Sequence, residues 1–283
     1  MSLNMFVTDF DGTLLTDEKV ILDKDLETLS RLRQEETVTA IATGRSFYSF
    51  QRALDQMGMT LDQMPVDYLI FCTGAGVYCL GTDRLLLSHA ISKPDVKEVC
   101  ACFDAFEFDY MVHKSIPDTP YFLYNTRGEK ENPDFYHRID LYSGFGRPME
   151  DGAELYDAAT QVLAIIPGGI SPETLARVRD CLDRFSVIQA TSPLDHKSVW
   201  LEVFHRDASK SRSVAWLAGH LDICRTRVVS VGNDYNDKDL LEWSGLGLLV
   251  ENGPEDMKDA FGRVGSNNCG GVSQAARVAG LIG

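Results

Sequence analysis

The feature that most constrains this chain is a segment near its start, where an apolar strand ends in two aspartates. The apolar run Met5–Val7 is followed by Asp9 and Asp11, and then at once by Gly12 and Thr13. In an extended segment, side chains two residues apart point to the same side, so both carboxylates converge at the carboxyl end of a strand. Two carboxylates that close repel each other strongly. The pair therefore predicts a bound cation or a shared proton, and the alternative is a polar Asp-Gly turn after a strand.

Three further segments also carry chemically active residues next to apolar ones. The strand predicted at 37–42 runs into Thr43-Gly44-Arg45, and the strand predicted at 227–231 runs into the acidic stretch Gly232–Asp237. Lys210 opens an amphipathic segment with apolar residues at helical spacing. Together these segments supply carboxylates, a hydroxyl beside a glycine amide, and a lysine. The combination predicts a phosphate site with a divalent metal.

The first part of the chain alternates between strand and helix patterns. Strands are predicted at 4–8, 37–42 and 68–72, and helices at 23–35 and 46–57. Alternation of this kind predicts a parallel sheet with helices on both faces. Ligands of such sheets bind beyond the carboxyl ends of the strands, which is where the polar segments fall.

The middle of the chain has a different pattern, with aromatic residues and turns crowding residues 117–149. Its predicted elements are helices at 94–106 and 171–185 and strands at 109–114, 121–124, 161–166 and 186–191. We therefore predict an α/β protein, a Rossmann-like parallel sheet core with an inserted α+β cap domain. The core is assigned to 1–84 and 196–283 and the cap to 85–195, with a strand at 199–203 returning the chain to the core.

Composition excludes several classes of function. A net charge of −15 argues against binding to nucleic acid or anionic membranes, both of which require basic patches. No membrane helix is expected, since no apolar run reaches about 18 residues. No signal peptide is expected either, since the pattern at the start of the sequence predicts a strand. The seven cysteines show no zinc-type pairing and the six histidines no His-Glu-x-x-His pattern. These observations favour a reduced, cytoplasmic protein.

The chain resembles the haloacid dehalogenase (HAD) superfamily of phosphohydrolases in the order and spacing of Asp9, Asp11, Thr43, Lys210 and Gly232–Asp237. It looks most like the Cof-type sugar-phosphatase branch, which has an α/β cap that matches the insert. Where that branch usually has Asn-Gly-Ala, this chain has Thr-Gly-Ala at 73–75. Residues 250–255 resemble the Met-Gly-Asn-Ala-Pro-Glu motif of the branch. The resemblance implies a Mg²⁺-dependent phosphatase that hydrolyses a small phosphorylated metabolite, with a sugar phosphate as the expected substrate, through an aspartyl-phosphate. The alternatives are a phosphomutase-like phosphotransferase and a catalytically weak sugar-phosphate sensor.

The resemblance also implies roles for the first motif. Asp9 is the expected nucleophile, because a carboxylate can attack phosphorus and divide one displacement into two steps. Asp11 is the expected general acid and base for the leaving alcohol and the hydrolytic water. The backbone amides of Gly12 and Thr13 are expected to cradle the phosphate.

The second and third motifs supply the expected phosphate-binding groups. Thr43 should donate its hydroxyl to a phosphate oxygen beside the Gly44 amide, or else serve as the N-cap of the next helix. Arg45 either contacts the substrate or pairs with a surface acid. Lys210 should neutralise the phosphate and hold Asp9 ready, and its alternative is a solvated lysine in a first helical turn.

The acidic stretch departs from the family's Gly-Asp-x-x-Asn-Asp, because Asn233 stands at the usual metal-binding aspartate. Either Asn233 binds the metal through its amide oxygen or Asp234 takes the position; strand geometry favours Asn233 and charge favours Asp234. Asp9 and Asp11 complete the predicted metal site, and Mg²⁺ is the expected cation. Asp237 and Asn236 are expected around the metal, its waters and Lys210.

The remaining expectations concern substrate and partners. Asn252 is a candidate phosphate-binding residue, with an Asn-Gly turn as the alternative. The expected partner is a small phosphate ester, and the protein is expected to be a monomer or weak homodimer. Cap residues that could select the substrate, although each is more often a surface or packing residue, are His113, Tyr124, Arg127, His137, Arg138, Tyr142 and Arg147.

Overall fold

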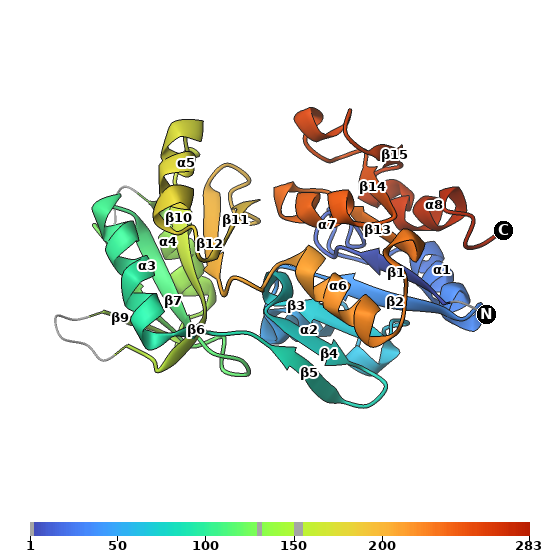
Figure 1. Cartoon of the computed structure of the whole chain (residues 1–283), viewed down its shortest axis with the longest axis horizontal. Coiled ribbons are helices and arrows are strands. Elements are labelled where there is room, and N and C mark those ends of the chain that lie inside the picture. Colours follow the sequence, from blue (N-terminus) through green and yellow to red (C-terminus); the bar gives the residue numbers. More distant parts are fainter. Residues whose placement is uncertain (1–2, 129–131, 150–154) are drawn as a thin grey trace. The chain divides into compact units, whose positions relative to one another are not determined.

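The structure, a computed structural model, describes residues 3–128, 132–149 and 155–283 (Figure 1). The described residues form two compact units. The first unit comprises the residues up to Leu87 and those from Ser209 onward, and the second comprises Ser88–Ala208. The second unit is thus an insertion in the sequence of the first.

The first unit is built on an eight-stranded sheet in the order β15-β14-β13-β1-β2-β3-β4-β5. The six strands from β15 to β3 pair in parallel, and β4 is antiparallel to β3. The strands are β1 Asn4–Thr8, β2 Thr37–Ala42, β3 Tyr68–Phe71, β4 Gly76–Cys79, β5 Arg84–Ser88, β13 Val228–Gly232, β14 Leu246–Val250 and β15 Gly262–Val264.

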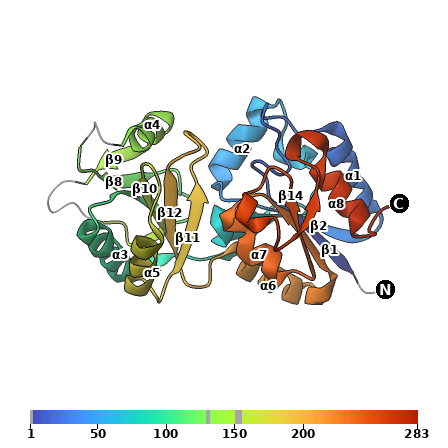
Figure 2. The ribbon, with the colours of Figure 1, turned by 90° about the horizontal axis from the view of Figure 1, so that it is seen from above.

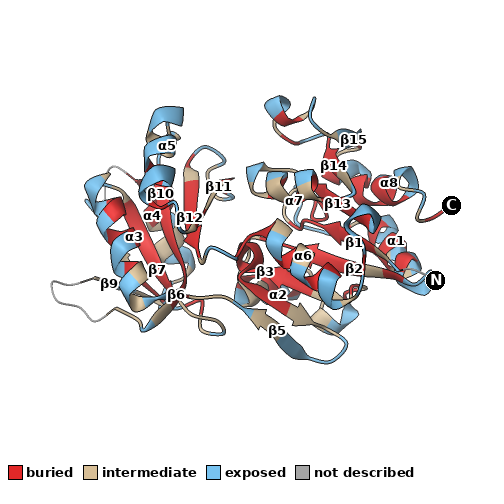
Figure 3. Cartoon of the chain, in the orientation of Figure 1, coloured by how far each residue is buried: buried red, intermediate tan, exposed pale blue. Residues whose placement is uncertain are grey.

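Helices cover both faces of this sheet, with α1, α2 and α8 on one side and α6 and α7 on the other (Figure 2). Their bounds are α1 Asp23–Gln34, α2 Phe47–Gln56, α6 Lys210–His220, α7 Lys238–Trp243 and α8 Gly271–Val278. Apolar side chains of α6 and α7 pack on β1 and β2, most of whose residues are buried (Figure 3). The predicted parallel sheet with helices on both faces is confirmed.

Strand β1 lies at the centre of the sheet, between β13 and β2. Its parallel register aligns Thr8 with Val231 on one side and with Ile41 on the other. The segments that follow β1, β2 and β13 therefore leave the sheet at the same edge. This alignment places the three predicted motifs side by side.

The second unit has a seven-stranded sheet in the order β11-β12-β10-β7-β8-β9, with β6 also paired to β10. Helices α3 and α5 pack on one face through one apolar cluster, and α4 packs on the other through a second cluster (Figure 2). The elements are β6 Ile91–Ser92, α3 Lys93–Ala105, β7 Asp109–Lys114, β8 Phe122–Asn125, α4 Pro133–Leu141, β9 Gly146–Pro148, β10 Ala158–Ile166, α5 Pro172–Cys181, β11 Ser186–Thr191 and β12 Val199–Phe204. The inserted α+β module is as predicted.

Two expectations about this region were wrong. The strand expected to return the chain to the core is β12, which pairs with β10 and β11 along its whole length and so belongs to the second unit. The first unit resumes at Ser209 and not at residue 196. Helix α4 was not predicted; it lies in the stretch 117–149, which is crowded with aromatics and turns and where the one predicted element was the strand at 121–124. Residues 129–131 of this stretch fall outside the described residues. In the part of the chain that the structure describes, no helix has the length and apolarity to span a membrane.

Candidate active site

Three side chains from three segments meet at the carboxyl edge of the first sheet. The Lys210 ammonium lies 2.7 Å from Oδ1 of Asp9 and also forms an ion pair with Asp237. Lys210 and Asp237 are fully buried and Asp9 is 4% exposed. A buried charged group is stable only when it is paired, so each charge here depends on the other two. The structure thus excludes the solvated alternative for Lys210.

Local sequence explains how these groups come together. Ser209 caps α6 by accepting a hydrogen bond from the Arg212 amide, so Lys210 is the first helical residue. At the end of β13, Gly232 leaves room for Asp237, because a Cβ at residue 232 would lie 2.5 Å from the Asp237 Cβ. The absence of a side chain there lets the acidic loop fold back onto the strand.

The ion pairs act against the effect of burial on each group. Burial and the neighbouring Asp237 carboxylate raise the pKa of Asp9 to about 7, although Lys210 opposes this shift. Burial alone would lower the pKa of Lys210, but Asp237 and Asp9 outweigh it and raise that pKa above its ordinary value. Lys210 is therefore a permanent cation beside Asp9.

Asp11 is bound by Arg45 through a two-point ion pair. Nε and a terminal nitrogen of Arg45 each lie 2.6 Å from one carboxylate oxygen of Asp11. Arg45 also donates to the Ser49 carbonyl at 3.1 Å and lies over the Phe10 ring. Its partner is thus the candidate acid–base residue itself and not a distant surface acid. Sequence reasoning did not foresee this pairing.

Thr43 is buried in the turn that follows β2. Its hydroxyl accepts a hydrogen bond from the Arg45 amide at 3.1 Å, and a hydroxyl that accepts can still donate its own proton. The alternative role as N-cap is wrong, because Ser46 caps α2 by accepting from the Ser49 amide. Gly44 lies beside Asn236, whose amide nitrogen would be 3.6 Å from a Cβ at residue 44.

Asn233 faces the first motif. In the orientation that satisfies its amide atoms, its nitrogen donates to Oδ2 of Asp9 at 3.2 Å, to the Asp11 carbonyl at 2.9 Å and to the Thr13 hydroxyl at 3.2 Å. Gly12 adopts φ of +72°, and a Cβ there would lie 2.5 Å from the Asn233 amide. The Asp-x-Asp-Gly-Thr turn and Asn233 thus pack directly against each other.

Asp234 and Asp237 have structural partners within their own loop. The Asp234 side chain accepts from the Asp237 backbone amide, and Oδ2 of Asp237 accepts from the amides of Asn233 and Asp234 at 2.8 and 3.1 Å. This reciprocal capping box begins the short helix Tyr235–Asp237. Asp234 therefore caps a helix, whereas Asn233 faces Asp9.

Hard cations accept carboxylate, carbonyl and amide oxygens alike. Within the described residues no three His, Cys, Asp or Glu side chains cluster as metal ligands. The Asp9 carboxylate and the Asp11 carbonyl, however, converge on the Asn233 amide. This donor set fits Mg²⁺, provided that the amide turns its oxygen toward the ion.

Asn252 lies next to the first motif but contacts its backbone. Its side-chain nitrogen donates to the Gly12 carbonyl at 2.8 Å, and its oxygen accepts from the Asn267 amide at 3.0 Å. The simple Asn-Gly turn is therefore not its only role. Asn267 and Asn268, which sequence reasoning missed, bind Asp17 further along the same loop. Asn267 and Asp17 are 250 residues apart in the chain, and nothing in the local sequence pattern indicates so distant a partner.

Several candidate cap residues have structural partners within the second unit. Burial, with Arg138 nearby, lowers the pKa of His113 to about 3, and its Nδ1 contacts the Thr119 carbonyl at 2.9 Å. Arg127 pairs with Asp104, and Arg138 stacks over Trp200. These contacts support packing roles for His113, Arg127 and Arg138.

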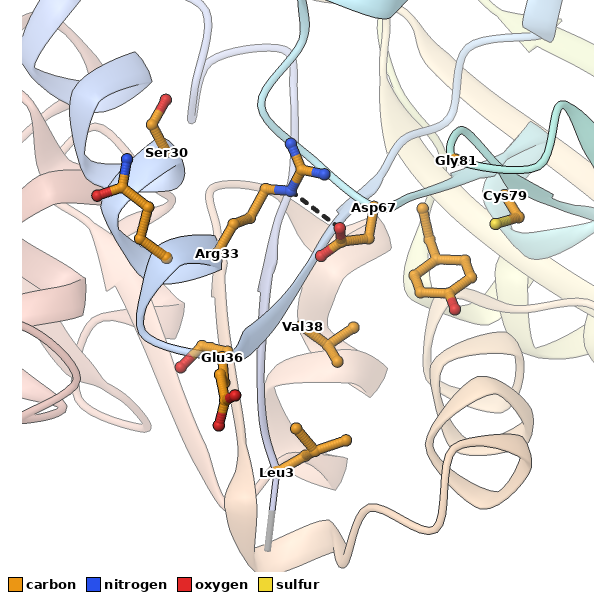
Figure 4. A pocket seen from close by; sticks show the side chains of 11 residues that line it. Leu3, Ser30, Arg33, Glu36, Val38, Asp67, Cys79 and Gly81 are labelled. Carbon is orange, nitrogen blue, oxygen red and sulfur yellow. Dashed lines mark hydrogen bonds and ion pairs between the residues drawn. The ribbon is translucent and has the colours of Figure 1, made fainter. Parts of the chain in front are cut away.

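A separate pocket of about 630 Å³ lies at the opposite edge of the first sheet, where β2 and β3 begin (Figure 4). In it Arg33 pairs with Asp67, their Nε and Oδ1 atoms 2.9 Å apart. None of the predicted site residues lines this pocket. The candidate active site is therefore the carboxyl-edge cluster around Asp9.

Comparison with known proteins agrees with this geometry. The family model of the haloacid dehalogenase-like hydrolases matches residues 6–275. The chain belongs to this family. Residues 6–275 include all the motifs described above, so the resemblance seen in the sequence is confirmed.

Several relatives are named as phosphatases and have a similar length. A putative phosphatase of Bacillus subtilis (strain 168), YxeH, is 25% identical over 96% of this chain and 96% of its own length. From the same organism, 5-amino-6-(5-phospho-D-ribitylamino)uracil phosphatase YitU is 23% identical over 93% of this chain and 92% of its own. These relatives and the family match confirm the expected enzyme class, a phosphatase of this family.

Solved structures show the same fold. The phosphatase BT1666 from Bacteroides thetaiotaomicron superposes with a TM-score of 0.75 at 17% identity, covering 99% of this chain and 96% of that one. The HAD subclass IIB sugar phosphatase BT4131 gives 0.74 at 17% identity, covering 99% and 100%. Both matches show that the fold is shared over nearly the whole of this chain.

Proposed function

We propose that this enzyme is a Mg²⁺-dependent phosphatase that hydrolyses a small phosphorylated metabolite, a sugar phosphate in the first instance, through an aspartyl-phosphate on Asp9. The observation that carries the proposal is the buried set of ion pairs in which Lys210 binds both Asp9 and Asp237, beside Asp11. Lys210 holds one oxygen of the Asp9 carboxylate, which orients the side chain for attack. The substrate class is supported by the sugar-phosphatase and ribityl-phosphate-phosphatase names of two similar proteins.

The reaction then proceeds in two displacements. An Asp9 carboxylate oxygen forms a bond to phosphorus while the bond from phosphorus to the ester oxygen breaks, and Asp11 gives a proton to the departing alcohol. Water then attacks the aspartyl-phosphate, Asp11 takes up its proton, and inorganic phosphate leaves with Asp9 restored. Lys210 and the Thr43 hydroxyl stabilise the negative charge of the transferred group.

Arg45 is proposed as the residue that positions Asp11. Its planar guanidinium contacts both carboxylate oxygens, so it restricts the rotation of the Asp11 side chain. Asp11 must exchange one of these contacts for the leaving-group oxygen during the reaction. Arg45 thereby acts through Asp11, even if it also touches the substrate.

We propose that Asp9, the Asp11 carbonyl and Asn233 hold Mg²⁺, which when bound neutralises negative charge on the phosphate. The capping role of Asp234 supports Asn233 over Asp234 as the ligand. Asp237 is proposed to act through Lys210 and the loop backbone. The Gly12, Thr13 and Gly44 amides and Asn236 are proposed to line the phosphate site.

The proposed setting follows from charge and thiol chemistry. All seven cysteines lie within the described residues and none of them forms a disulfide there, which supports a reducing, cytoplasmic location. The net charge of −15 supports a protein that acts on a small ester without binding nucleic acid or membranes. A monomer or weak homodimer remains the proposed oligomeric state.

The test is a panel of phosphorylated metabolites, assayed for release of inorganic phosphate with Mg²⁺ and without any bisphosphate activator. A hydrolase releases phosphate under these conditions, whereas a phosphomutase requires the activator. Acid-quenched enzyme should contain a phosphorylated peptide that includes Asp9. Asp9→Asn keeps the size and shape of the side chain, and it should lose both the phosphopeptide and turnover. Appreciable turnover by pure Asp9→Asn protein would show that the nucleophile is another group.

A further inference from the structure

Three asparagines from the C-terminal part of the first unit hold the loop that follows the nucleophile. Asn252 bridges the Gly12 carbonyl and the Asn267 amide, at 2.8 and 3.0 Å. Asn267 is fully buried, and its side-chain nitrogen donates to the Leu15 carbonyl at 3.1 Å and to Asp17 at 3.0 Å. Asn268 exchanges two hydrogen bonds with Asp17, at 3.0 and 2.9 Å. The loop is thus tied at Gly12, Leu15 and Asp17.

The contact at Gly12 determines the direction of a neighbouring amide. The Gly12 carbonyl and the Thr13 N–H belong to one planar trans peptide group, so they point in opposite directions. A hydrogen bond that holds the carbonyl therefore also aims the Thr13 N–H. Within the loop this N–H has only a long contact of 3.4 Å to the Phe10 carbonyl. Its orientation consequently depends on what holds the Gly12 carbonyl.

The other side of the same turn contacts Asn233. A Cβ at Gly12 would lie 2.5 Å from the Asn233 amide, and the Thr13 hydroxyl lies 3.2 Å from that amide. The Gly12–Thr13 peptide is therefore held between Asn252 on one side and Asn233 on the other. A rotation of this peptide would displace the Asn233 side-chain amide, which faces Asp9.

We infer that Asn252 is a positioning residue for phosphoryl transfer, and that the buried Asn267 holds it in place. Asn252 fixes the Gly12–Thr13 peptide, so that the turn after the nucleophile keeps its shape and Asn233 stays against Asp9. The effect on catalysis rests on the proposed function, but the effect on the loop does not. Because Asn252 is itself exposed, its replacement should change loop order more than global stability.

Asn252→Asp is the sharpest variant. A carboxylate can still accept from the Asn267 amide but has no proton to donate to the Gly12 carbonyl. Asn268→Ala is the matched control, since it removes an asparagine from the same segment while Asn267 still holds Asp17. Asn252→Ala removes both contacts of Asn252 and provides a second test.

Two measurements test the inference separately. Hydrogen exchange followed by mass spectrometry on the free protein should show faster exchange for residues 12–15 in both Asn252 variants, and unchanged exchange in Asn268→Ala. The second measurement is the single-turnover rate constant for phosphorylation of Asp9, because this constant does not depend on the fraction of enzyme molecules that are active. It should fall about 10- to 100-fold in both Asn252 variants, as expected when a reacting geometry is displaced. The control should remain within about twofold of the wild type.

The outcomes separate this inference from the proposed function. Unchanged exchange at residues 12–15 would overturn the role of Asn252 in the loop, whatever the enzyme hydrolyses. Faster exchange with an unchanged rate constant would overturn its role in catalysis. If the wild-type protein forms no phosphorylated Asp9, the proposed function fails, and the exchange experiment still decides whether Asn252 holds the loop.

Discussion

Replacing Asn233 by aspartate should tighten the binding of Mg²⁺ and lower the free energy of unfolding of the metal-free protein. The Asn233 amide nitrogen donates to Oδ2 of Asp9 at 3.2 Å and to the Asp11 carbonyl at 2.9 Å. Aspartate at residue 233 would place a carboxylate oxygen against these two oxygens. Both hydrogen bonds would be lost and two negative charges would face each other. A cation between them relieves that repulsion.

The size of the effect follows from the separation of the charges. Two unit charges 3.2 Å apart repel by about 5 kcal/mol at an effective dielectric constant of about 20. Lys210 neutralises part of the Asp9 charge, which leaves a net penalty of roughly 2–3 kcal/mol in the metal-free protein. Mg²⁺ binding removes this penalty, so the dissociation constant should fall roughly 30- to 160-fold.

The assay needs no substrate. Calorimetric titration with MgCl₂ gives the dissociation constant, and urea unfolding in EDTA and in saturating Mg²⁺ gives the stability of each form. Asn233→Asp should be less stable than wild type in EDTA and should recover in Mg²⁺. Asp234→Ala is the control: it should lose about 1 kcal/mol as a lost helix cap while its Mg²⁺ dissociation constant stays within about twofold.

Equal affinities and equal metal-free stabilities for wild type and Asn233→Asp would refute the reasoning. A loss of Mg²⁺ binding in Asp234→Ala would instead identify Asp234 as the ligand. If neither substitution changes the metal requirement, the loop Gly232–Asp237 is not the metal loop.

Three further predictions concern individual side chains. Asp11→Asn should lower the steady-state rate of phosphate release by about 10²–10⁴, the usual contribution of a general acid–base group; an unchanged rate would assign that role elsewhere. Arg45→Lys keeps the charge but not the two-point contact, so its effect on kcat should be non-additive with that of Asp11→Asn, with a coupling of at least about 0.5 kcal/mol in a double-mutant cycle. Asp25 accepts from the Ser273 amide at 2.8 Å, but its Oδ2 is buried without a donor among the described residues, and burial raises its pKa. The raised pKa means that the charged form disfavours folding at neutral pH, so Asp25→Asn should raise the free energy of unfolding at pH 7 by about 1 kcal/mol. Because protonation of Asp25 removes this penalty, the gain in urea unfolding should shrink toward about pH 4, and a gain that does not depend on pH would contradict the argument.

The carboxyl-edge site was predictable because its residues follow strands. Asp9, Thr43 and Asn233 each come directly after a buried parallel strand, and parallel strands end at a common edge. Position along the chain was therefore enough to bring them together. Lys210 was predictable only as part of the family pattern, since a lysine that begins a helix carries no sign of burial.

The parts that could not be predicted depend on partners distant in sequence. The pairing of Arg45 with Asp11 is a contact between side chains, and neither residue indicates which acid or base it will meet. The strand Val199–Phe204 was recognisable as a strand, but its own residues do not reveal that β10 and β11 flank it. Helix α8 was not predicted, and its start carries Gly270 and Gly271, residues that usually mark a turn.

The insertion has a consequence for the order in which the molecule forms. Asp9 and Lys210 are 201 residues apart in the chain, and β1 pairs with β13 only after the whole inserted unit has been synthesised. The second unit is continuous in sequence, so its sheet can close over shorter loops while the β13 edge of β1 is still unpaired. During translation the nascent chain therefore carries an incomplete first sheet, in which the backbone groups of β1 that later pair with β13 are still unpaired. We expect the nucleophile to gain its lysine only in the last stage of folding, after residues 228–232 have emerged.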